Sequence, residues 1–397
     1  MRDAAPLRWV ADLTMMGMRM LSRVVVPAVA LAAAAVLAGC TVDGSPQRGP
    51  VDLDLGKYGS MQAATLPSAT TDGQWAKLRA VRLADHIVFP VDIDAGMTDI
   101  KMPTMPIVVP KNLGLVMSEM VDLPVMKRFQ YGFSMAAGNG PNDFGVNHVV
   151  MRFADDRSAG DAVTQIGGVA AKPKDYYKPG GGRVDVAGMP PGSVVVHNVG
   201  SGNKHVFVAV SQSGPYVVYT WADSPDRAWG ERAIVTAFDK QKSLLDAIGP
   251  ENPDRNPDPT GLIRGTIRVP SDEQTVSTQI VFGQRGAALL YGNGPEAYSE
   301  LKKAGITAAA LNQTQAYRAA GAAQAEGWRD YLIKGFGDDT SRKAASPRDL
   351  SSAKCFQKDD RVGCFIAVGD YVGEAYGKEL IDTQQQISAV YTFLKAM

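Results

Sequence analysis

Histidine and cysteine are scarce in this sequence, which has four histidines and three cysteines in 397 residues. No histidine stands in an H-E-x-x-H pattern or at a zinc-binding distance from cysteine. The chain also lacks a G-x-S-x-G elbow and a phosphate-binding P-loop. The sequence therefore gives no reason to predict a catalytic residue, a cofactor or a metal site. It favours a protein that is not an enzyme.

The sequence also has no excess of positive or negative charge, and it has no long apolar run after residue 40. The 41 Lys and Arg residues balance the 41 Asp and Glu residues, and no basic block occurs. Because nucleic-acid binding needs a basic patch, nucleic acid is not expected as a partner. After residue 40 no apolar run approaches the about 20 residues of a membrane-spanning helix.

The first 40 residues have the features of a signal peptide. Arg19 and Arg23 precede an apolar run over 24–38, and the run closes on Leu-Ala-Gly-Cys at Cys40. This ending resembles the lipobox of bacterial lipoproteins, which implies cleavage before Cys40 and acylation of that residue, for example by palmitate. Acyl chains in pairs anchor a protein stably. Met18 and Met20 are alternative start residues to Met1, and an uncleaved anchoring helix remains the alternative interpretation.

The two remaining cysteines are expected to form a disulfide. Residues 353–357 and 362–368 look like strands joined at Asp359-Asp360, which places Cys355 opposite Cys364 in a non-hydrogen-bonded pair. Such pairs lie near disulfide distance, and an exported protein meets oxidising conditions. Two free buried thiols are the alternative.

The periodicity of apolar residues and the proline- and glycine-rich breaks between segments predict an α+β fold. It should have two similar lobes, each an antiparallel sheet with packed helices. The expected division is a signal peptide over 1–40, a tether over 41–50, a first lobe over 51–249, a Pro-rich linker over 250–260, and a second lobe with the disulfide hairpin over 261–397. Both lobes end in a helix, three strands and a helix. Phe207 and Phe365 correspond at a constant offset, which leaves open a diverged internal repeat.

Several segments resemble a family of actinobacterial cell-envelope lipoproteins whose shared domain has no assigned function. The segments are Val51 to Tyr58, Phe89 to Asp94, Tyr131 to Ser134, Val149 to Ala154, Gly283 to Ala287 and Ala304 to Thr307. The resemblance implies an envelope context but supplies no active site. Cys40 is the one functional residue that it carries over.

Two groups of side chains are candidates for ligand binding. Met97, Met102 and Met105 lie in the segment 91–126, which its prolines are expected to make irregular. They can fill gaps over a core, line a groove for a lipid or protein partner, or bind copper(I). Tyr176 and Tyr177, with two tryptophans further along the chain, can form a platform for a glycan or belong to the core and its rim.

The histidine pair His197 and His205 depends on strand register. A turn centred between Ser201 and Gly202 places His197 opposite Val206, so that the two rings point to opposite faces of the sheet. A shift of one residue would bring the rings together.

The sequence therefore predicts a lipid-anchored protein on the extracytoplasmic face of the cell membrane. We expect it to bind a lipid, a glycan or an envelope protein in or near a cleft between the lobes. An envelope hydrolase with a non-standard site and a purely structural envelope component remain the alternatives.

Overall fold

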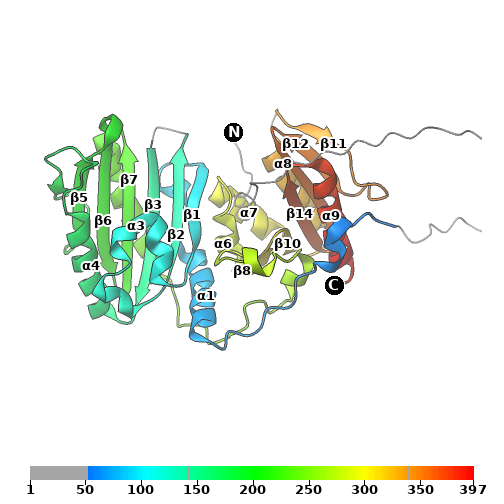
Figure 1. Cartoon of the computed structure of the whole chain (residues 1–397), viewed down its shortest axis with the longest axis horizontal. Helices are drawn as coiled ribbons and strands as arrows, with labels where there is room; N and C mark the ends of the chain where they lie inside the picture. The colour runs from blue at the N-terminus through cyan, green and yellow to red at the C-terminus, as the bar shows by residue number, and fades with distance from the viewer. Residues whose placement is uncertain (1–51, 141–143, 338–339) are drawn as a thin grey trace, which may run out of the picture.

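The computed structural model describes residues 52–140, 144–337 and 340–397 (Figure 1). Signal peptide, Cys40 and tether lie outside these residues. The described part forms two lobes, each built on a seven-stranded antiparallel sheet with helices packed on it, so the predicted α+β class is confirmed. Among the described residues no helix is long and apolar enough to cross a membrane.

The first lobe has the strand order β1-β2-β3-β7-β6-β5-β4. Helices α4 and α5 lie on opposite faces of this sheet, and α1 packs beside α5 near β1 and β2. Its elements are α1 (Asp72–Leu83), α2 (Pro90–Ile93), β1 (Asp99–Ile107), α3 (Gly114–Met117), β2 (Phe129–Asn139), β3 (Phe144–Phe153), α4 (Asp156–Ala170), β4 (Gly182–Arg183), β5 (Val194–Val199), β6 (His205–Ser213), β7 (Tyr216–Ser224) and α5 (Arg227–Asp246).

The second lobe has the order β8-β9-β10-β14-β13-β12-β11, which repeats the first lobe strand for strand. Helix α8 follows its third strand as α4 does, α9 follows its last strand as α5 does, and α6 and α7 are inserted after its first strand. Its elements are β8 (Ile280–Gly283), α6 (Gln284–Ala288), α7 (Gly294–Lys303), β9 (Ala308–Leu311), β10 (Gln315–Arg318), α8 (Ala322–Phe336), β11 (Arg342–Ala344), β12 (Lys354–Lys358), β13 (Arg361–Val368), β14 (Tyr371–Gly377) and α9 (Leu380–Lys395).

Strand β1 shows where the sequence pattern misled us. The proline-broken segment was expected to be irregular, yet β1 pairs with β2 through Pro106, with a change of register between Lys101 and Met105. The strand lies at the edge of its sheet, where a missing N–H does not interrupt a second ladder.

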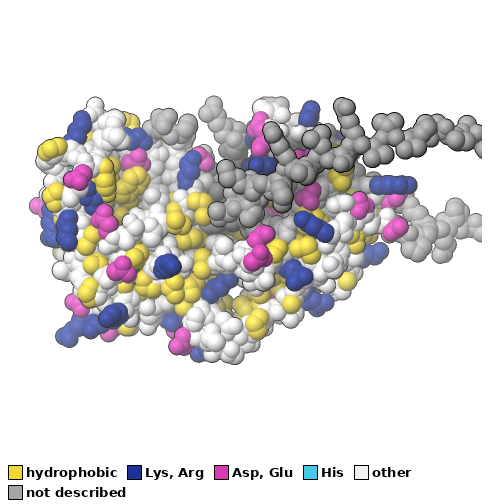
Figure 2. All heavy atoms as spheres, in the orientation of Figure 1, with side chains coloured by type: hydrophobic (Ala, Val, Ile, Leu, Met, Phe, Trp, Pro, Cys, Tyr) yellow, Lys and Arg dark blue, Asp and Glu magenta, His cyan; other side chains and the backbone are white. Residues whose placement is uncertain are grey.

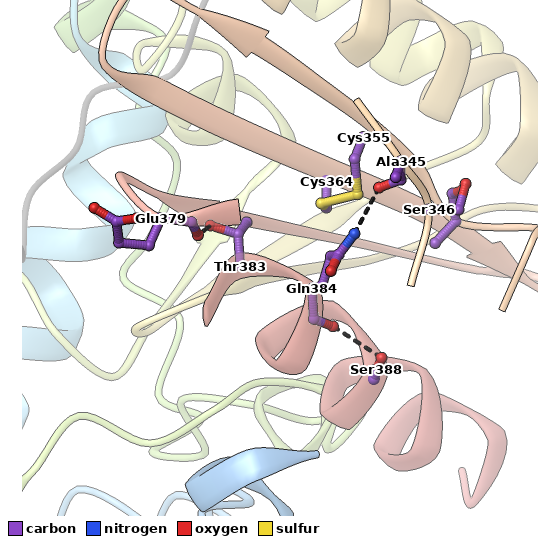
Figure 3. The surroundings of a disulfide bond; sticks show 9 residues. Ala345, Ser346, Cys355, Cys364, Glu379, Thr383, Gln384 and Ser388 are labelled. Carbon is purple, nitrogen blue, oxygen red and sulfur yellow. Dashed lines mark hydrogen bonds between the residues drawn. A yellow bond between two sulfur atoms is a disulfide. The ribbon is translucent and has the colours of Figure 1, made fainter. Parts of the chain in front are cut away.

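The hairpin of β12 and β13 has the predicted register. Lys358 pairs with Arg361, and Cys355 lies opposite Cys364 with their Cα atoms 4.1 Å apart. The two cysteines form a disulfide that is buried beside α9 (Figure 3). On α9, Gln384 points toward this hairpin and donates to the carbonyl oxygen of Ala345 at 2.7 Å.

One hydrophobic core joins the lobes. The α1 and α5 face of the first sheet and the α8 face of the second sheet belong to the same buried cluster. Within it the Phe133 ring of β2 meets the Phe282 ring of β8 edge to face, with centroids 6.2 Å apart. The far faces of the two sheets have separate cores, one under α4 and one under α9.

Residues 52–66, here called the strap, lie against the second lobe although they precede the first. Tyr58 is buried and its hydroxyl donates to Asp382 on α9 at 2.7 Å. Gln62 forms an isolated β-bridge with Ile267. The sequence analysis assigned all residues from 51 to 249 to the first lobe. The contacts of the strap, however, join it to the second lobe.

Candidate functional site

A cleft of about 380 Å³ opens beside α1 on the first lobe, at the point where the chain leaves α5 and enters the linker. We call it the arginine cleft because three arginines, Arg79, Arg82 and Arg152, line it. The other lining residues are Leu83, Asp85, His86, Tyr131, Pro215, Tyr216, Ile248, Gly249, Pro250, Glu251 and Asn252.

Two of the arginines fasten the linker to α1. Arg79 forms an ion pair with Glu251 at 2.6 Å and stacks on the Tyr131 ring, 4.3 Å from its centroid. Arg82 donates to the carbonyl oxygens of Asn252 at 3.0 Å and Asp254 at 2.7 Å. Burial lowers the pKa of Arg82 from its ordinary value, although the guanidinium stays charged at any physiological pH. Linker and helix thus form one fixed wall of the cleft.

The third arginine has no carboxylate partner within the described part of the chain. Arg152, on β3, donates to the carbonyl oxygen of Phe153, and its guanidinium carbon lies 5.4 Å from the centroid of the Tyr216 ring. Glu251 is already paired with Arg79, and the Arg82 guanidinium is occupied by the two linker carbonyls. Among the described residues of the cleft, Arg152 is therefore the arginine that is not tied to the linker. A guanidinium offers a planar fork of N–H donors that matches carboxylate and phosphate groups.

Asp85 does not neutralise this charge, because it faces the second lobe. Its carboxylate accepts the N–H of Gly286 at 2.6 Å. Burial raises the pKa of Asp85, and the hydrogen bond from Gly286 lowers it in part. In addition, Arg285 donates to the carbonyl oxygen of Ile87 at 3.1 Å, so the wall of the cleft is held by α6 of the second lobe.

Two family models match the chain. One, Domain of unknown function (DUF7373) N-terminal, covers residues 66–260, and the other, Domain of unknown function (DUF7373) C-terminal, covers residues 250–396. The chain belongs to this family. The arginine cleft lies within the N-terminal DUF7373 match, and the two matches overlap in the Pro-rich linker. The predicted membership of a family with a shared domain of unknown function is confirmed, whereas its actinobacterial and lipoprotein character stays a prediction.

A solved structure similar to this chain is the extracellular domain of PknH from Mycobacterium tuberculosis. The similarity covers 41% of this chain and 96% of that chain, at 16% sequence identity and a TM-score of 0.29. A likeness of this size supports no conclusion about function. No curated protein matches the chain.

The three methionines predicted to bind a ligand do not converge. Met97 is fully buried in the core between the lobes, and Met105 is buried in the core under α4. Met102 is 53% exposed. The first two fill the core, so the structure does not bring these three thioethers together in a copper site.

The two tyrosines do lie together. The rings of Tyr176 and Tyr177 have centroids 4.5 Å apart, and Tyr176 is 64% exposed. Trp221 lies close enough to Tyr177 to influence the pKa of its hydroxyl, which burial raises. However, Trp229 lies on the other side of the sheet, where its indole donates to Asp94 at 2.8 Å. The glycan platform would therefore consist of three of the four aromatic residues.

The expected register of the histidine hairpin is wrong by one residue. His197 pairs with Phe207 rather than Val206, because the turn has three residues, Ser201–Asn203, with positive φ at Gly202 and Asn203. The rings of His197 and His205 therefore share a face, with Nε2 of His197 and Nδ1 of His205 3.0 Å apart. Within the described residues no group of three or more His, Cys, Asp or Glu side chains is placed to hold a metal ion.

Sequence reasoning missed two buried ionisable groups. His148 on β3 lies between Thr220 at 2.9 Å and Gln241 at 3.2 Å, and burial lowers its pKa to about 4. Glu374 on β14 accepts from the hydroxyls of Tyr317 at 2.7 Å and Tyr376 at 2.6 Å, and burial raises its pKa to about 7. A histidine or glutamate within an otherwise apolar strand was the available signal. Both side chains are fully buried in the core, and neither of them lines the arginine cleft.

Proposed function

We propose that this protein is an exported, lipid-anchored envelope protein that binds a small anionic ligand, such as a sugar phosphate, in the arginine cleft. The observation that carries the proposal is Arg152, a cation without a carboxylate partner among the described residues, at the wall of a cleft of about 380 Å³. Cavities of a few hundred Å³ with a few convergent polar groups are typical ligand sites.

The chemistry of the cleft indicates the ligand class. Arg152 supplies the anion contact, and the neighbouring Tyr216 supplies a ring face and a hydroxyl that suit a sugar. The rigid wall, formed by α1 and the linker, lowers the entropy cost of binding because little has to become ordered.

Export is supported by two independent features. The first is the sequence pattern before Cys40, which is typical of a signal peptide. The second is the disulfide between Cys355 and Cys364, because disulfides persist in oxidising compartments. On the face shown in Figure 2, basic and acidic side chains are interspersed. Attachment to the membrane is therefore proposed to depend on the acylated cysteine.

The cleft is tested by calorimetric titration with glucose 6-phosphate, and with glucose as the uncharged probe. We expect the purified protein to prefer the phosphate, and Arg152→Gln to weaken its binding by about 10- to 100-fold, because a charge-assisted hydrogen bond contributes about 1.5–3 kcal/mol. Arg183→Gln, at an exposed arginine of β4, is the matched control. Equal binding of both sugars, or unchanged binding by Arg152→Gln, would contradict the proposal.

The anchor is tested separately in cells. We expect radiolabelled fatty acid to be incorporated into the wild-type protein, and Cys40→Ser to abolish labelling and to release the protein from the membrane fraction. Ser45→Ala, in the same segment, should leave both unchanged. Retention of Cys40→Ser in the membrane would remove the lipid anchor from the proposal without affecting the cleft.

A further inference from the structure

A second, smaller depression lies on the other side of α1, where the two lobes meet. We call it the Lys77 groove. It has a volume of about 160 Å³ and lies between α1, β8, the end of the strap and the linker. Its apolar walls include Leu66, Leu78, Val81, Pro257, Ile280 and Val281.

Of the described residues that line this groove, Lys77 alone is charged. Its ammonium donates to the carbonyl oxygen of Thr278 at 2.7 Å, and it forms no ion pair with any residue that the structure describes. Burial alone lowers the pKa of Lys77 to about 8, with no opposing contribution from a carboxylate. An ammonium has three N–H donors, so it can bind a further acceptor without leaving Thr278.

The other polar side chains of the groove do not supply a counter-charge. Gln74 is used within the capping box of α1, where its side chain accepts the N–H of Thr71 at 3.1 Å. Gln279 has a φ of 53°, a left-handed conformation that is unfavourable for a residue with a side chain. Such strain is often kept at binding sites, where the surrounding structure enforces it.

We propose that the Lys77 groove binds a small carboxylate with an apolar body, with the carboxylate on the Lys77 ammonium and the apolar body against Val81 and Ile280. The uncompensated charge at an apolar groove favours such a molecule over a neutral one of the same shape. A cavity of about 150 Å³ accommodates a benzene ring, so the body is a single ring or a short alkyl chain.

Binding is coupled to the protonation of Lys77. From about pH 6 to pH 8 the amine carries its proton and the ligand is a carboxylate, so the affinity is constant. Above pH 8 the free protein loses that proton, so the affinity falls by about tenfold for each pH unit until the pKa of the bound state is reached. Within the described part of the chain, no other titratable group lines the groove.

Benzoate and its neutral isostere benzamide are suitable probes, measured by calorimetry or ligand-observed NMR on the purified protein. At pH 7 we expect wild type to bind benzoate at least tenfold more tightly than benzamide. Lys77→Met keeps the apolar length of the side chain and removes its charge, so it should bind the two probes equally. Lys240→Met, at an exposed lysine of α5, should keep the preference of wild type.

The outcomes separate this proposal from the one for the arginine cleft. Equal affinity of wild type for both probes, failure to bind either of them, or a preference that survives in Lys77→Met would overturn the assignment of the groove. Weakened benzoate binding by Arg152→Gln would place benzoate in the arginine cleft and would also overturn it. Unchanged benzoate binding by Arg152→Gln supports the groove, whether or not glucose 6-phosphate binds the cleft.

Discussion

The two lobes have the same strand order and the same positions for two of their helices, yet they use these elements differently. In the first lobe the helix after the last strand, α5, packs into the core shared by the lobes. In the second lobe the equivalent helix, α9, covers a separate core, and α8 packs into the shared one. The lobes therefore meet through non-equivalent faces. A repeated topology does not imply a symmetric interface.

This asymmetry changes the meaning of the residue correspondence in the sequence. Phe207 lies on the face that α5 covers, whereas Phe365 packs against Phe336 of α8, with ring centroids 5.8 Å apart. The two phenylalanines occupy opposite faces of equivalent strands. The repeat is real in the strand order, but the matching residues are not structurally equivalent.

The buried ionisable groups also differ between equivalent strand pairs. In the first lobe His148 of β3 lies opposite Thr220 of β7. In the second lobe Glu374 of β14 lies opposite Gln315 of β10. Burial disfavours the charged form of both groups, so it lowers the pKa of the histidine and raises that of the glutamate. The two lobes should thus respond to pH in opposite directions.

The largest effect is expected from separating the lobes. Phe282→Ala removes the ring that meets Phe133 and should lower the free energy of unfolding by about 3–5 kcal/mol. We expect urea unfolding to change from one transition to two, because the shared core no longer couples the lobes.

Phe153→Ala is the matched control for this experiment, since Phe153 is equally buried but lies in the core under α4. It should cost a similar free energy within a single transition. If Phe282→Ala also unfolds in a single transition, the shared core is not what couples the lobes.

The next effect concerns pH. The folded protein holds the Glu374 proton up to about pH 7 while the unfolded chain releases it near pH 4.5, so stability falls as pH rises through this window. His148 acts the other way, because stability falls as pH decreases from 6.5 to about 4. Each shift corresponds to about 3 kcal/mol.

Urea unfolding of variants at several pH values measures these two contributions. The difference in stability between wild type and Glu374→Gln should change between pH 4.5 and 7, and the difference for His148→Asn should change between pH 6.5 and 4. A difference that stays constant across its window would show that the residue does not titrate as its burial implies.

A smaller effect is expected from the disulfide, which only the second of the two repeated sheets contains among the described residues. Replacing both Cys355 and Cys364 by Ala should lower the free energy of unfolding by about 2–3 kcal/mol, since the unfolded chain is no longer constrained. Limited proteolysis should then cut the second lobe first. Thiol labelling of denatured, unreduced wild type provides the check: two reactive thiols would contradict the bond.

The smallest effect is expected at the helix N-termini. Asp155 caps α4 by accepting the N–H of Ser158 at 2.7 Å, whereas Glu379 precedes α9 without a side-chain cap. Asp155→Ala should therefore cost about 1 kcal/mol and Glu379→Ala less than about 0.5 kcal/mol. Thermal unfolding measures both, and equal losses would show that the cap does not stabilise α4.

Local patterns explain which parts of the fold were predictable. The register of the β12–β13 hairpin follows from a turn of two residues, so Cys355 and Cys364 were paired correctly. In the histidine hairpin the turn has a third residue, and positive φ at Asn203 allows it, which no alternation of side chains could indicate. Strand register was therefore predictable from the sequence where the turn had its shortest form, and not where the turn contained an additional residue.

Long-range packing was less accessible from the sequence. The arginine cleft depends on five segments that are separated in the chain, and none of its arginines stands in a motif. Whether Arg152 has a carboxylate partner is decided by the path of the linker, which pairs Glu251 with Arg79 instead. Likewise, Met97 and Met105 are close in sequence, but a sheet separates the cores that contain them.

The strap is synthesised before the second lobe, although it packs against that lobe. Because Tyr58 binds Asp382 on α9, the first residues of the strap cannot dock fully until α9 has been made, whereas Gln62 needs only Ile267. The first lobe can form earlier, as domains generally do during translation, but the strap must wait for the C-terminal half. Closure of the strap over α9 must therefore follow synthesis of α9, and a chain truncated before Asp382 would lack the acceptor of the Tyr58 hydroxyl.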